Sequence, residues 1–248
     1  MSKKQKIKNQ NGSICVYLTE SRRKSVGTLV AVHGGPGGDH RGNEGIFDEI
    51  AMYCGDLGYN LAQFDMYGAG GSDGKPADIT LKTQLRDYNS VVDYAAAKLR
   101  GPVHVVGESM GATIAALNWR ADIASFVLLW PAFDLKDTDL RPYFDIKWKQ
   151  VLDQRGYIDD NGVVLGREFL DEIVETDFSN CFRLPKAPCL LVHGKMDTAV
   201  PFQQSLRAVD QAAGESVLFA HPTGDHGLVR PQEREFTRRA IKWWLSNK

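Results

Sequence analysis

Short, nearly continuous hydrophobic runs alternate with amphipathic stretches along most of the chain. The runs are bounded by Gly, Pro and Asp, a pattern typical of parallel strands that are buried on both faces. They predict six strands, at residues 28–32, 60–64, 103–106, 126–129, 189–192 and 217–219. Between the runs, hydrophobic residues recur every three or four positions. This alternation of strands and helices predicts an α/β fold with a mostly parallel central sheet and helices on both faces.

The helical spacing is clearest in three places. It predicts helices over residues 46–57 and 81–99, the second with an N-cap at Thr80, and a C-terminal helix that begins at Pro231. Residues 6–18, which turn at Asn11 and Gly12, are predicted to form a hairpin at the edge of the sheet. The lysines before it, in residues 1–6, are interpreted as a solvated tail.

Residues 131–184 interrupt this rhythm, because they follow a predicted strand but do not lead promptly to another. The segment is rich in charged and aromatic residues and is too long for a bare connection. We therefore expect a small helical insertion at 131–184, within a core formed by residues 1–130 and 185–248.

Composition narrows the class of protein. The 248 residues are 43% hydrophobic and 25% charged, with a formal net charge of −1. This balance is typical of a globular chain and argues against a surface devoted to nucleic acid or anionic lipid. No apolar run approaches the ~20 residues that span a bilayer, and the start of the chain does not resemble a signal peptide. The four cysteines contain no C-x-x-C pair, so we expect reduced thiols, no metal site and a cytoplasmic protein.

Candidate chemistry begins at Gly107-Glu108-Ser109-Met110-Gly111, a complete G-x-S-x-G motif. A predicted buried strand precedes it and a stretch of small residues at helical spacing follows it. In such a turn the serine takes a strained backbone conformation that lifts its hydroxyl above the sheet. The pentapeptide alone is a weak signal, but its place between strand and helix makes Ser109 a strong candidate nucleophile.

A serine hydroxyl needs a base, and the base needs an acid that orients it. Asp197 stands just past the predicted strand 189–192, and His226 lies in the last loop before the C-terminal helix. Their order, serine, acid and then histidine, is the one found with this strand–turn–helix motif. Asp134 is a competing acid, because it also follows a strand. Asp225 adjoins the histidine, but neighbouring side chains usually point apart.

Glycine makes up 24 of the 248 residues and gathers in the predicted loops. The loop 33–38 follows the first central strand, where backbone amides could stabilise an oxyanion. We assign these donors to Gly35 and to Met110. Neither this loop nor the glycine-rich loop 68–74 has the spacing of a phosphate or dinucleotide site, so no cofactor is expected. Both loops are predicted at the rim of one site, at the carboxyl edge of the sheet.

Together, these motifs resemble the α/β-hydrolase-fold serine hydrolases over nearly the whole chain. The chain is most similar to compact carboxylesterases, including feruloyl and cinnamoyl esterases and monoacylglycerol lipase-like enzymes. The resemblance implies that residues 131–184 form a lid. It also implies hydrolysis of small to medium acyl or aryl esters through Ser109, His226 and Asp197, with an acyl-enzyme intermediate and a small-molecule ester as the partner. Five aromatic residues are candidates for the substrate pocket: Trp130, Phe133, Tyr143, Phe144 and Trp148.

Several alternatives stay open at this point. The loop 33–38 also resembles that of proline iminopeptidases, and a thioesterase could use the same three residues. A cofactor-free haloperoxidase, a C–C hydrolase and a non-catalytic binding protein are more distant alternatives. The aromatic side chains could equally hold the insertion to the body. The oligomeric state is open between a monomer and a homodimer.

Overall fold

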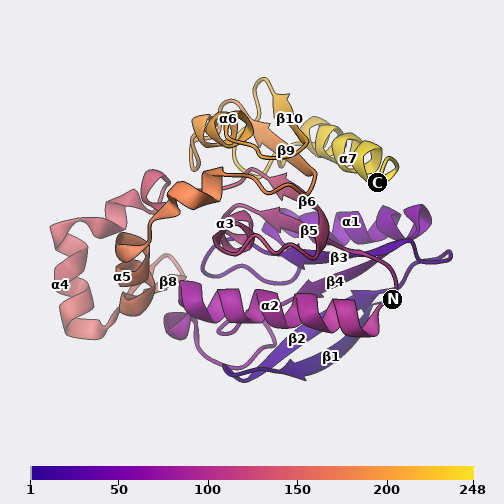
Figure 1. Cartoon of the computed structure of the whole chain (residues 1–248). Coiled ribbons are helices and arrows are strands. Elements are labelled where there is room, and N and C mark those ends of the chain that lie inside the picture. The colour runs from indigo at the N-terminus through magenta and orange to yellow at the C-terminus, as the bar shows by residue number, and fades with distance from the viewer. Residues whose placement is uncertain (1) are drawn as a thin grey trace.

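The computed structural model describes residues 2–248 and contains a central sheet of eight strands (Figure 1). Their order across the sheet is β1-β2-β4-β3-β5-β6-β9-β10. The strands are β1 (Lys3–Lys8), β2 (Ser13–Thr19), β3 (Gly27–Val32), β4 (Tyr59–Phe64), β5 (Val103–Glu108), β6 (Ile123–Leu129), β9 (Cys189–Gly194) and β10 (Ser216–His221). From β4 to β10 all neighbours are parallel, whereas β1 and β2 are antiparallel additions. The six predicted strands are confirmed.

Helices cover both faces of this sheet, as the alternation predicts. One face carries α1 (Ile46–Cys54) and α7 (Pro231–Leu245), and the other carries α2 (Leu81–Lys98), α3 (Met110–Leu117) and α6 (Gln203–Asp210). The predicted cap is present, since the Thr80 side chain accepts a hydrogen bond from the Thr83 amide at 3.0 Å. Within residues 2–248, no helix is long and apolar enough to cross a bilayer.

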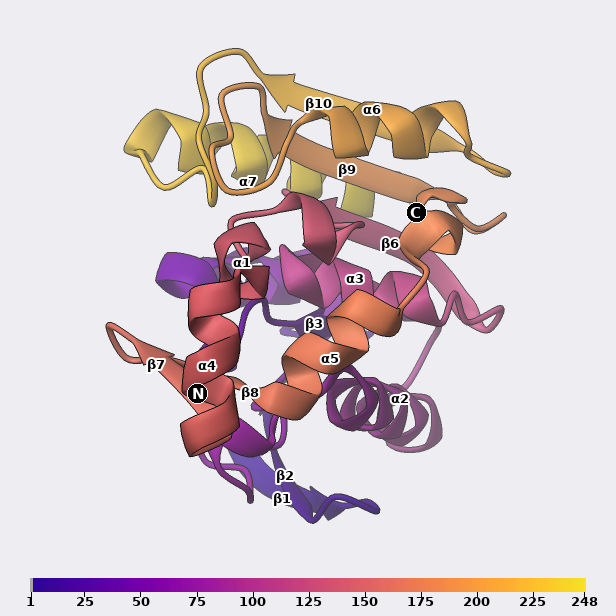
Figure 2. The same cartoon turned by 90° about the vertical axis from the view of Figure 1, so that its left-hand side faces the viewer.

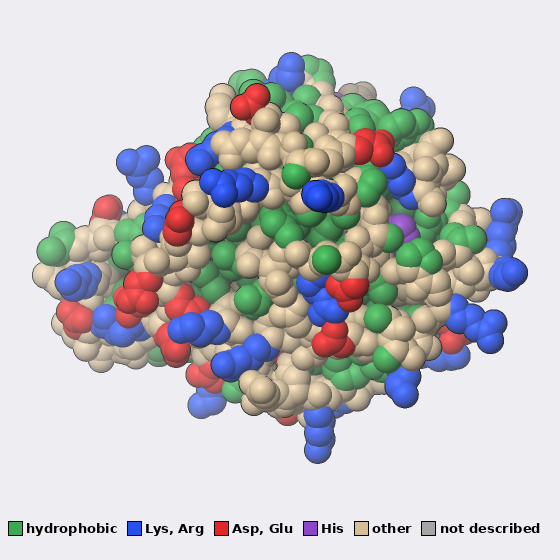
Figure 3. All heavy atoms as spheres, viewed as in Figure 1, with side chains coloured by type: hydrophobic (Ala, Val, Ile, Leu, Met, Phe, Trp, Pro, Cys, Tyr) green, Lys and Arg blue, Asp and Glu red, His purple; other side chains and the backbone are tan. Residues whose placement is uncertain are grey.

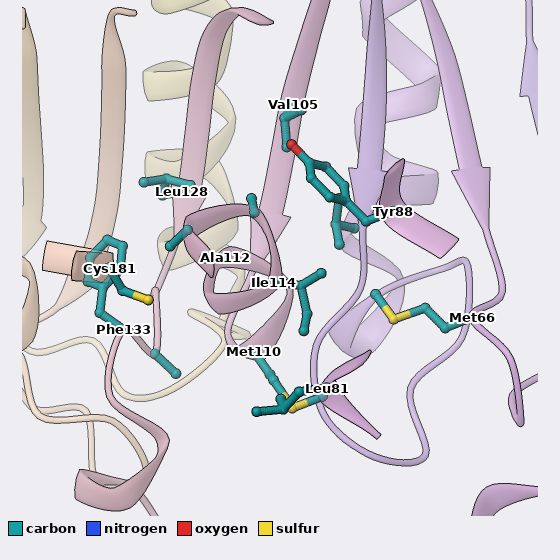
Figure 4. Packing of buried hydrophobic residues seen from close by; sticks show 14 of the residues in the cluster. Met66, Leu81, Tyr88, Val105, Met110, Ala112, Ile114, Leu128, Phe133 and Cys181 are labelled. Atoms are coloured by element: carbon teal, nitrogen blue, oxygen red, sulfur yellow. The ribbon is translucent and has the colours of Figure 1, made fainter. Parts of the chain in front are cut away.

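Two hydrophobic clusters lie on the two sides of the sheet, and alternate residues of each strand supply them. In β3, Val30 and Val32 face α2 and α3, whereas Leu29 and Ala31 face α1 and α7. Figure 4 shows the first cluster around α3, with the side chain of Met110 beside Leu81. The nucleophile turn is therefore anchored by side chains that pack below it.

The N-terminal hairpin is confirmed, but its first strand starts earlier than predicted. β1 begins at Lys3, so the interpretation of residues 2–6 as a solvated tail is wrong; Met1 lies outside the described residues. Gln5 and Ile7 turn partly inward while the lysines stay exposed. Lysines on an edge strand discourage pairing with another chain. Figure 3 shows positive and negative side chains interspersed over one face of the molecule.

Residues 131–184 fold between β6 and β9 and project at the left of the molecule in Figure 1; in Figure 2 they face the viewer. The segment contains the helices α4 (Ile146–Arg155) and α5 (Arg167–Glu175), as expected, with short 3-10 turns before and after them. It also contains a hairpin of β7 (Tyr157–Asp160) and β8 (Val163–Gly166), which was not predicted. Asn161 and Gly162 turn this hairpin with positive φ angles of 53° and 87°, the geometry that an Asn-Gly pair favours.

Candidate active site

Ser109 occupies a sharp turn between β5 and α3. Its φ and ψ angles are 50° and −121°, a conformation that costs about 1–3 kcal/mol and persists only where the surroundings enforce it. Glycines make the turn sterically feasible. A Cβ atom on Gly111 would collide with the carbonyl oxygen of Val32, and one on Gly34 would lie 2.9 Å from the Cβ atom of Ser109. The turn therefore needs glycine both at position 111 of the motif and at position 34 of the neighbouring loop.

The structure brings Ser109, His226 and Asp197 together from three separate loops. The Ser109 hydroxyl oxygen lies 3.2 Å from Nε2 of His226. Nδ1 of His226 lies 2.8 Å from Oδ2 of Asp197. Because an ionised carboxylate can only accept, Nδ1 carries the hydrogen and Nε2 is free to accept one from the serine. This is the arrangement that a serine nucleophile, its base and an orienting acid require.

Asp197 is fully buried and accepts four hydrogen bonds. Oδ1 accepts from the amides of Ala199 and Val200 at 2.9 and 2.8 Å, and Oδ2 accepts from His193 at 3.0 Å as well as from His226. Burial by itself would raise the pKa of Asp197. The hydrogen bonds from His193 and His226 and the charge of His226 outweigh burial and hold this pKa well below its usual range.

Sequence reasoning did not assign His193 a role. It lies in β9, is fully buried, and its Nδ1 is 2.7 Å from the hydroxyl oxygen of Ser205. The hydrogen bond between Nδ1 and the Ser205 hydroxyl orients the ring so that Nε2 can donate to Asp197. No sequence signal identifies this contact, since it depends on how α6 packs beside β9.

The pKa of His226 is raised above its ordinary value. Burial favours the neutral imidazole, but the hydrogen bond to Asp197 and the negative charges of Asp197, Glu108 and Asp139 outweigh burial. The imidazole also packs against the indole of Trp130, with ring centroids 6.4 Å apart and planes 70° apart. The neighbouring carboxylates therefore stabilise the imidazolium form, and the indole packs against the ring.

The competing candidates lie elsewhere or bond to other groups. Asp134 accepts from the Lys136 amide in a 3-10 turn. Asp225 accepts from Thr198 and from the backbone amide of His226, not from its ring. Neither side chain is hydrogen bonded to the imidazole of His226, so among the described acids Asp197 is the one that orients it.

A cavity of about 460 Å³ opens in front of Ser109. Ser109 and four lining residues around it belong to the core of the fold. We call these five the floor: Gly34, Glu108, Ser109, Met110 and His226. Six more come from residues 131–184. Ala132 lies directly after β6, and we call the other five the roof: Leu135, Thr138, Asp139, Leu140 and Val163. Much of the remaining wall is the loop after β3, including Gly35.

Both predicted oxyanion donors reach this cavity. Gly35 has a positive φ of 48°, and within residues 2–248 its amide has no hydrogen-bond acceptor. Met110 is the first residue of α3, where backbone amides have no partner within the helix. Two amides are thus available to a negatively charged oxygen.

The five aromatic residues predicted to contact substrate lie outside the cavity lining. Trp130 is fully buried and donates from Nε1 to Glu108, and Phe133 is buried against Phe182. Phe144 is partly buried against the core. Tyr143 donates to Asp160 at 2.8 Å and packs against Trp148, with ring centroids 5.5 Å apart. Their contact with a substrate stays a prediction.

The glycine-rich loop 68–74 also differs from expectation, because it does not line the cavity. It braces the N-terminal hairpin instead. The amide of Ser13 donates to Asp73 and the amide of Cys15 donates to Ser72, while the amide of Gly71 donates to Asp65. The glycines of loop 33–38 therefore line the cavity, whereas those of loop 68–74 allow close contact with the N-terminal hairpin.

The parallel sheet, its helices on both faces and the strand–serine–helix turn define an α/β-hydrolase fold. The model of the Hydrolase_4 family, described as "Serine aminopeptidase, S33", matches residues 23–156, and the chain belongs to this family. Among curated proteins, the chain is similar to the mitochondrial palmitoyl-protein thioesterase ABHD10 of Mus musculus. The two are 26% identical over 190 residues, which cover 72% of this chain and 63% of that protein. This chain thus covers less than two thirds of the length of that relative.

Solved structures share the fold over almost their full length. The ferulic acid-bound Est1E from Butyrivibrio proteoclasticus has a TM-score of 0.80 and 23% identity, covering 97% of this chain and 98% of that one. A putative hydrolase from Agrobacterium vitis also has a TM-score of 0.80, with 24% identity and 99% coverage of both chains. The chain is therefore an α/β-hydrolase-fold protein with esterase and thioesterase relatives.

Proposed function

We propose that this protein is a serine hydrolase that cleaves carboxylic esters of small to medium acyl or aryl groups. One observation carries the proposal: two successive hydrogen bonds join Ser109, His226 and Asp197 at the floor of a cavity. The nucleophile, base and orienting acid of acyl transfer need this connectivity. A cavity of about 460 Å³ suits a small organic substrate.

In the proposed reaction, the Ser109 oxygen attacks the ester carbonyl while its proton passes to Nε2 of His226. The carbonyl oxygen becomes an oxyanion, which the amides of Gly35 and Met110 stabilise. The imidazolium then protonates the leaving alcohol as the carbon–oxygen bond breaks, which leaves an acyl group on Ser109. Water attacks this acyl-enzyme, and His226 takes the water's proton and returns it to the serine as the acid departs.

The raised pKa of His226 supports this assignment, because the imidazole must hold the serine's proton until the leaving alcohol takes it, and later the water's proton until the serine takes it back. Asp197 stays ionised beside it, since its pKa is lowered. The acid therefore stabilises the imidazolium without taking its proton.

Residues 131–184 form the lid in this proposal. They supply the roof of the cavity, so the acyl or alcohol group of a substrate would contact Leu135, Leu140 and Val163. Exchange of this segment between relatives would alter substrate choice and leave the chemistry of the floor unchanged.

Two other leaving groups are favoured by particular observations. The thioesterase name of the mouse relative favours a thioester. The family description favours a peptide amine, and so does the cavity wall, where the exposed carboxylates of Glu44 and Asp139 form no ion pair within residues 2–248. A substrate ammonium could approach these groups.

A hydrolysis panel separates these functions. It compares p-nitrophenyl acetate and octanoate, phenyl esters, an acyl thioester and aminoacyl anilides, each with wild type and Ser109→Ala. We expect ester hydrolysis by wild type and its loss in the variant. Faster turnover of the thioester or the anilide would move the assignment to a thioesterase or an aminopeptidase. Ester hydrolysis that persists in Ser109→Ala would refute the proposed nucleophile.

A further inference from the structure

Glu108 is a buried carboxylate next to Ser109 in the chain. It ends β5 and is 3% exposed. Among the described residues, it has no cationic partner and no hydrogen bond to Ser109, His226 or Asp197. An ionised group in such a place is costly unless its surroundings supply hydrogen bonds. Hydrogen bonds from three neighbouring segments meet this need.

The carboxylate of Glu108 joins three separate segments of the floor and wall. Oε1 accepts from the amide of Gly34 at 2.7 Å and from the amide of Asn43 at 3.2 Å. Oε2 accepts from Nε1 of Trp130 at 3.0 Å. Gly34 follows β3, Asn43 precedes α1 and Trp130 follows β6. One side chain thus links the nucleophile turn to three other segments beside the cavity.

The bond to Gly34 acts on the oxyanion donor. Gly35 follows Gly34 directly and has a positive φ, and nothing lies within 4 Å of the position where its Cβ atom would be. No side chain therefore packs on this peptide from the Gly35 side; its carbonyl oxygen, that of Gly34, lies 3.0 Å from Nδ1 of His33. The hydrogen bond from the Gly34 amide to Glu108 anchors the adjacent backbone to the same strand that carries Ser109, which fixes donor and nucleophile relative to each other.

The bond to Trp130 acts on the base. Trp130 has a positive φ of 37°, an unusual conformation for a bulky residue, and its indole packs against the imidazole of His226. The hydrogen bond to Glu108 holds this indole in place. The negative charge of Glu108 also lies close enough to help raise the pKa of His226.

We propose that Glu108 is a positioning residue of this site: it anchors the Gly34–Gly35 backbone that stabilises the oxyanion, and it orients Trp130 against His226. Its carboxylate also stabilises the imidazolium form of His226. This inference rests on the proposed acyl-transfer function. It deepens that function by assigning a role to the variable position of the G-x-S-x-G motif.

Asp87 offers a matched control. It is also fully buried, and its carboxylate accepts from the Tyr67 amide at 2.6 Å and from the side chains of Asn9 and Asn11 at 2.7 and 2.9 Å. It does not line the cavity. Asp87→Asn removes a buried charge that joins two loops, so it reports the effect of such a loss on folding alone.

The test compares Glu108→Gln, Glu108→Met and Asp87→Asn. Gln keeps one oxygen for the Gly34 amide but loses the charge and turns an NH₂ group toward the Trp130 N–H. Met loses all three hydrogen bonds. We expect kcat per fluorophosphonate-titrated site to fall about tenfold in Glu108→Gln and about 10²-fold in Glu108→Met, with little change in KM. We also expect both variants to shift the acid limb of the pH profile to lower pH.

Two NMR measurements test the role of Glu108 without measuring turnover. They are therefore informative even if the hydrolysis panel detects no activity. In wild type, the Gly34 amide should exchange slowly with solvent. Exchange should accelerate in Glu108→Met and stay slow in Glu108→Gln, while the His226 ring titrates at lower pH in both. Asp87→Asn should change neither. Wild-type His226 titration in folded Glu108→Gln, or wild-type kcat per titrated site, would overturn the proposal. Failure of Glu108→Met to fold leaves Glu108→Gln as the deciding variant.

Discussion

The floor and the roof of the cavity are built differently. The floor belongs to the central sheet and its tightest turn, where Glu108 and Met110 are 3% and 2% exposed and glycines permit close backbone contact. The roof comes from a segment of short helices and a hairpin in which Asp139 is exposed and Val163 is 38% exposed. In the proposed function, the tightly packed floor carries the chemistry, and substrate choice depends on a segment that can vary without disturbing the floor.

The largest effect should follow a change below the floor. Asp197→Asn keeps the shape of the side chain but can present its NH₂ group to Nδ1 of His226, which favours the wrong tautomer. We expect kcat/KM for the ester to fall about 10⁴-fold. The neighbouring acid provides the control: Asp225→Asn should cost less than about tenfold, because Asp225 does not contact the ring. Equal losses in both variants would contradict the assignment of Asp197.

Matched glycine substitutions should show the same contrast in stability. A Cβ atom at Gly111 would collide with the Val32 carbonyl, so Gly111→Ala should lower the free energy of unfolding by about 3 kcal/mol and slow the labelling of Ser109. Gly156 lies in the insertion with φ +77° and open space around it. Gly156→Ala should cost only about 1 kcal/mol of backbone strain and leave labelling unchanged. Urea unfolding measures both, and a reversed order would refute the contrast.

The pH profile of kcat/KM should report the titration of His226 in the floor. His226 accepts a proton only when neutral, so kcat/KM should rise with pH and fall about tenfold per unit below the midpoint. Because the pKa of His226 is raised, this midpoint should lie above the ordinary histidine value of about 6.5. Asp197 stays ionised over this range, since its pKa is lowered. A flat profile between about pH 5 and 8 would argue against His226 as the base.

A roof substitution should have the smallest effect and a different signature. Leu140→Ala removes apolar wall from the cavity, so KM for an octanoyl ester should rise about three- to tenfold while kcat stays within about twofold. The acetyl ester, which is too short to fill the cavity, should show little change. Leu206→Ala is the control, because Leu206 is 49% exposed on α6 and does not line the cavity. A kcat loss in Leu140→Ala would mean that the roof takes part in the chemistry.

This contrast also explains what the sequence could reveal. Strands, covering helices and the order Ser109, Asp197 and His226 follow from local periodicity and from a motif whose geometry is nearly invariant. The Asn161-Gly162 pair is typical of a tight hairpin turn and indicates the β7–β8 hairpin, although the segment as a whole is predicted to be helical.

The supporting contacts had no such signal. The role of Glu108 depends on the distance from β5 to three other loops, and that of His193 on the packing of α6 against β9. The sequence does not predict the residues of the roof either, because they lie in irregular turns and on a short strand. Tertiary packing, not periodicity, decides which of their side chains face the cavity.

The central claim is that Ser109 is a nucleophile activated by His226 and Asp197. The most direct measurement is mass-spectrometric mapping of the adduct formed with a fluorophosphonate, in wild type and in Asp197→Asn. The account predicts one adduct per chain, on Ser109, formed at least about 10²-fold more slowly in the variant. An unlabelled wild-type protein, an adduct on another residue, or equal rates in the two proteins would contradict it.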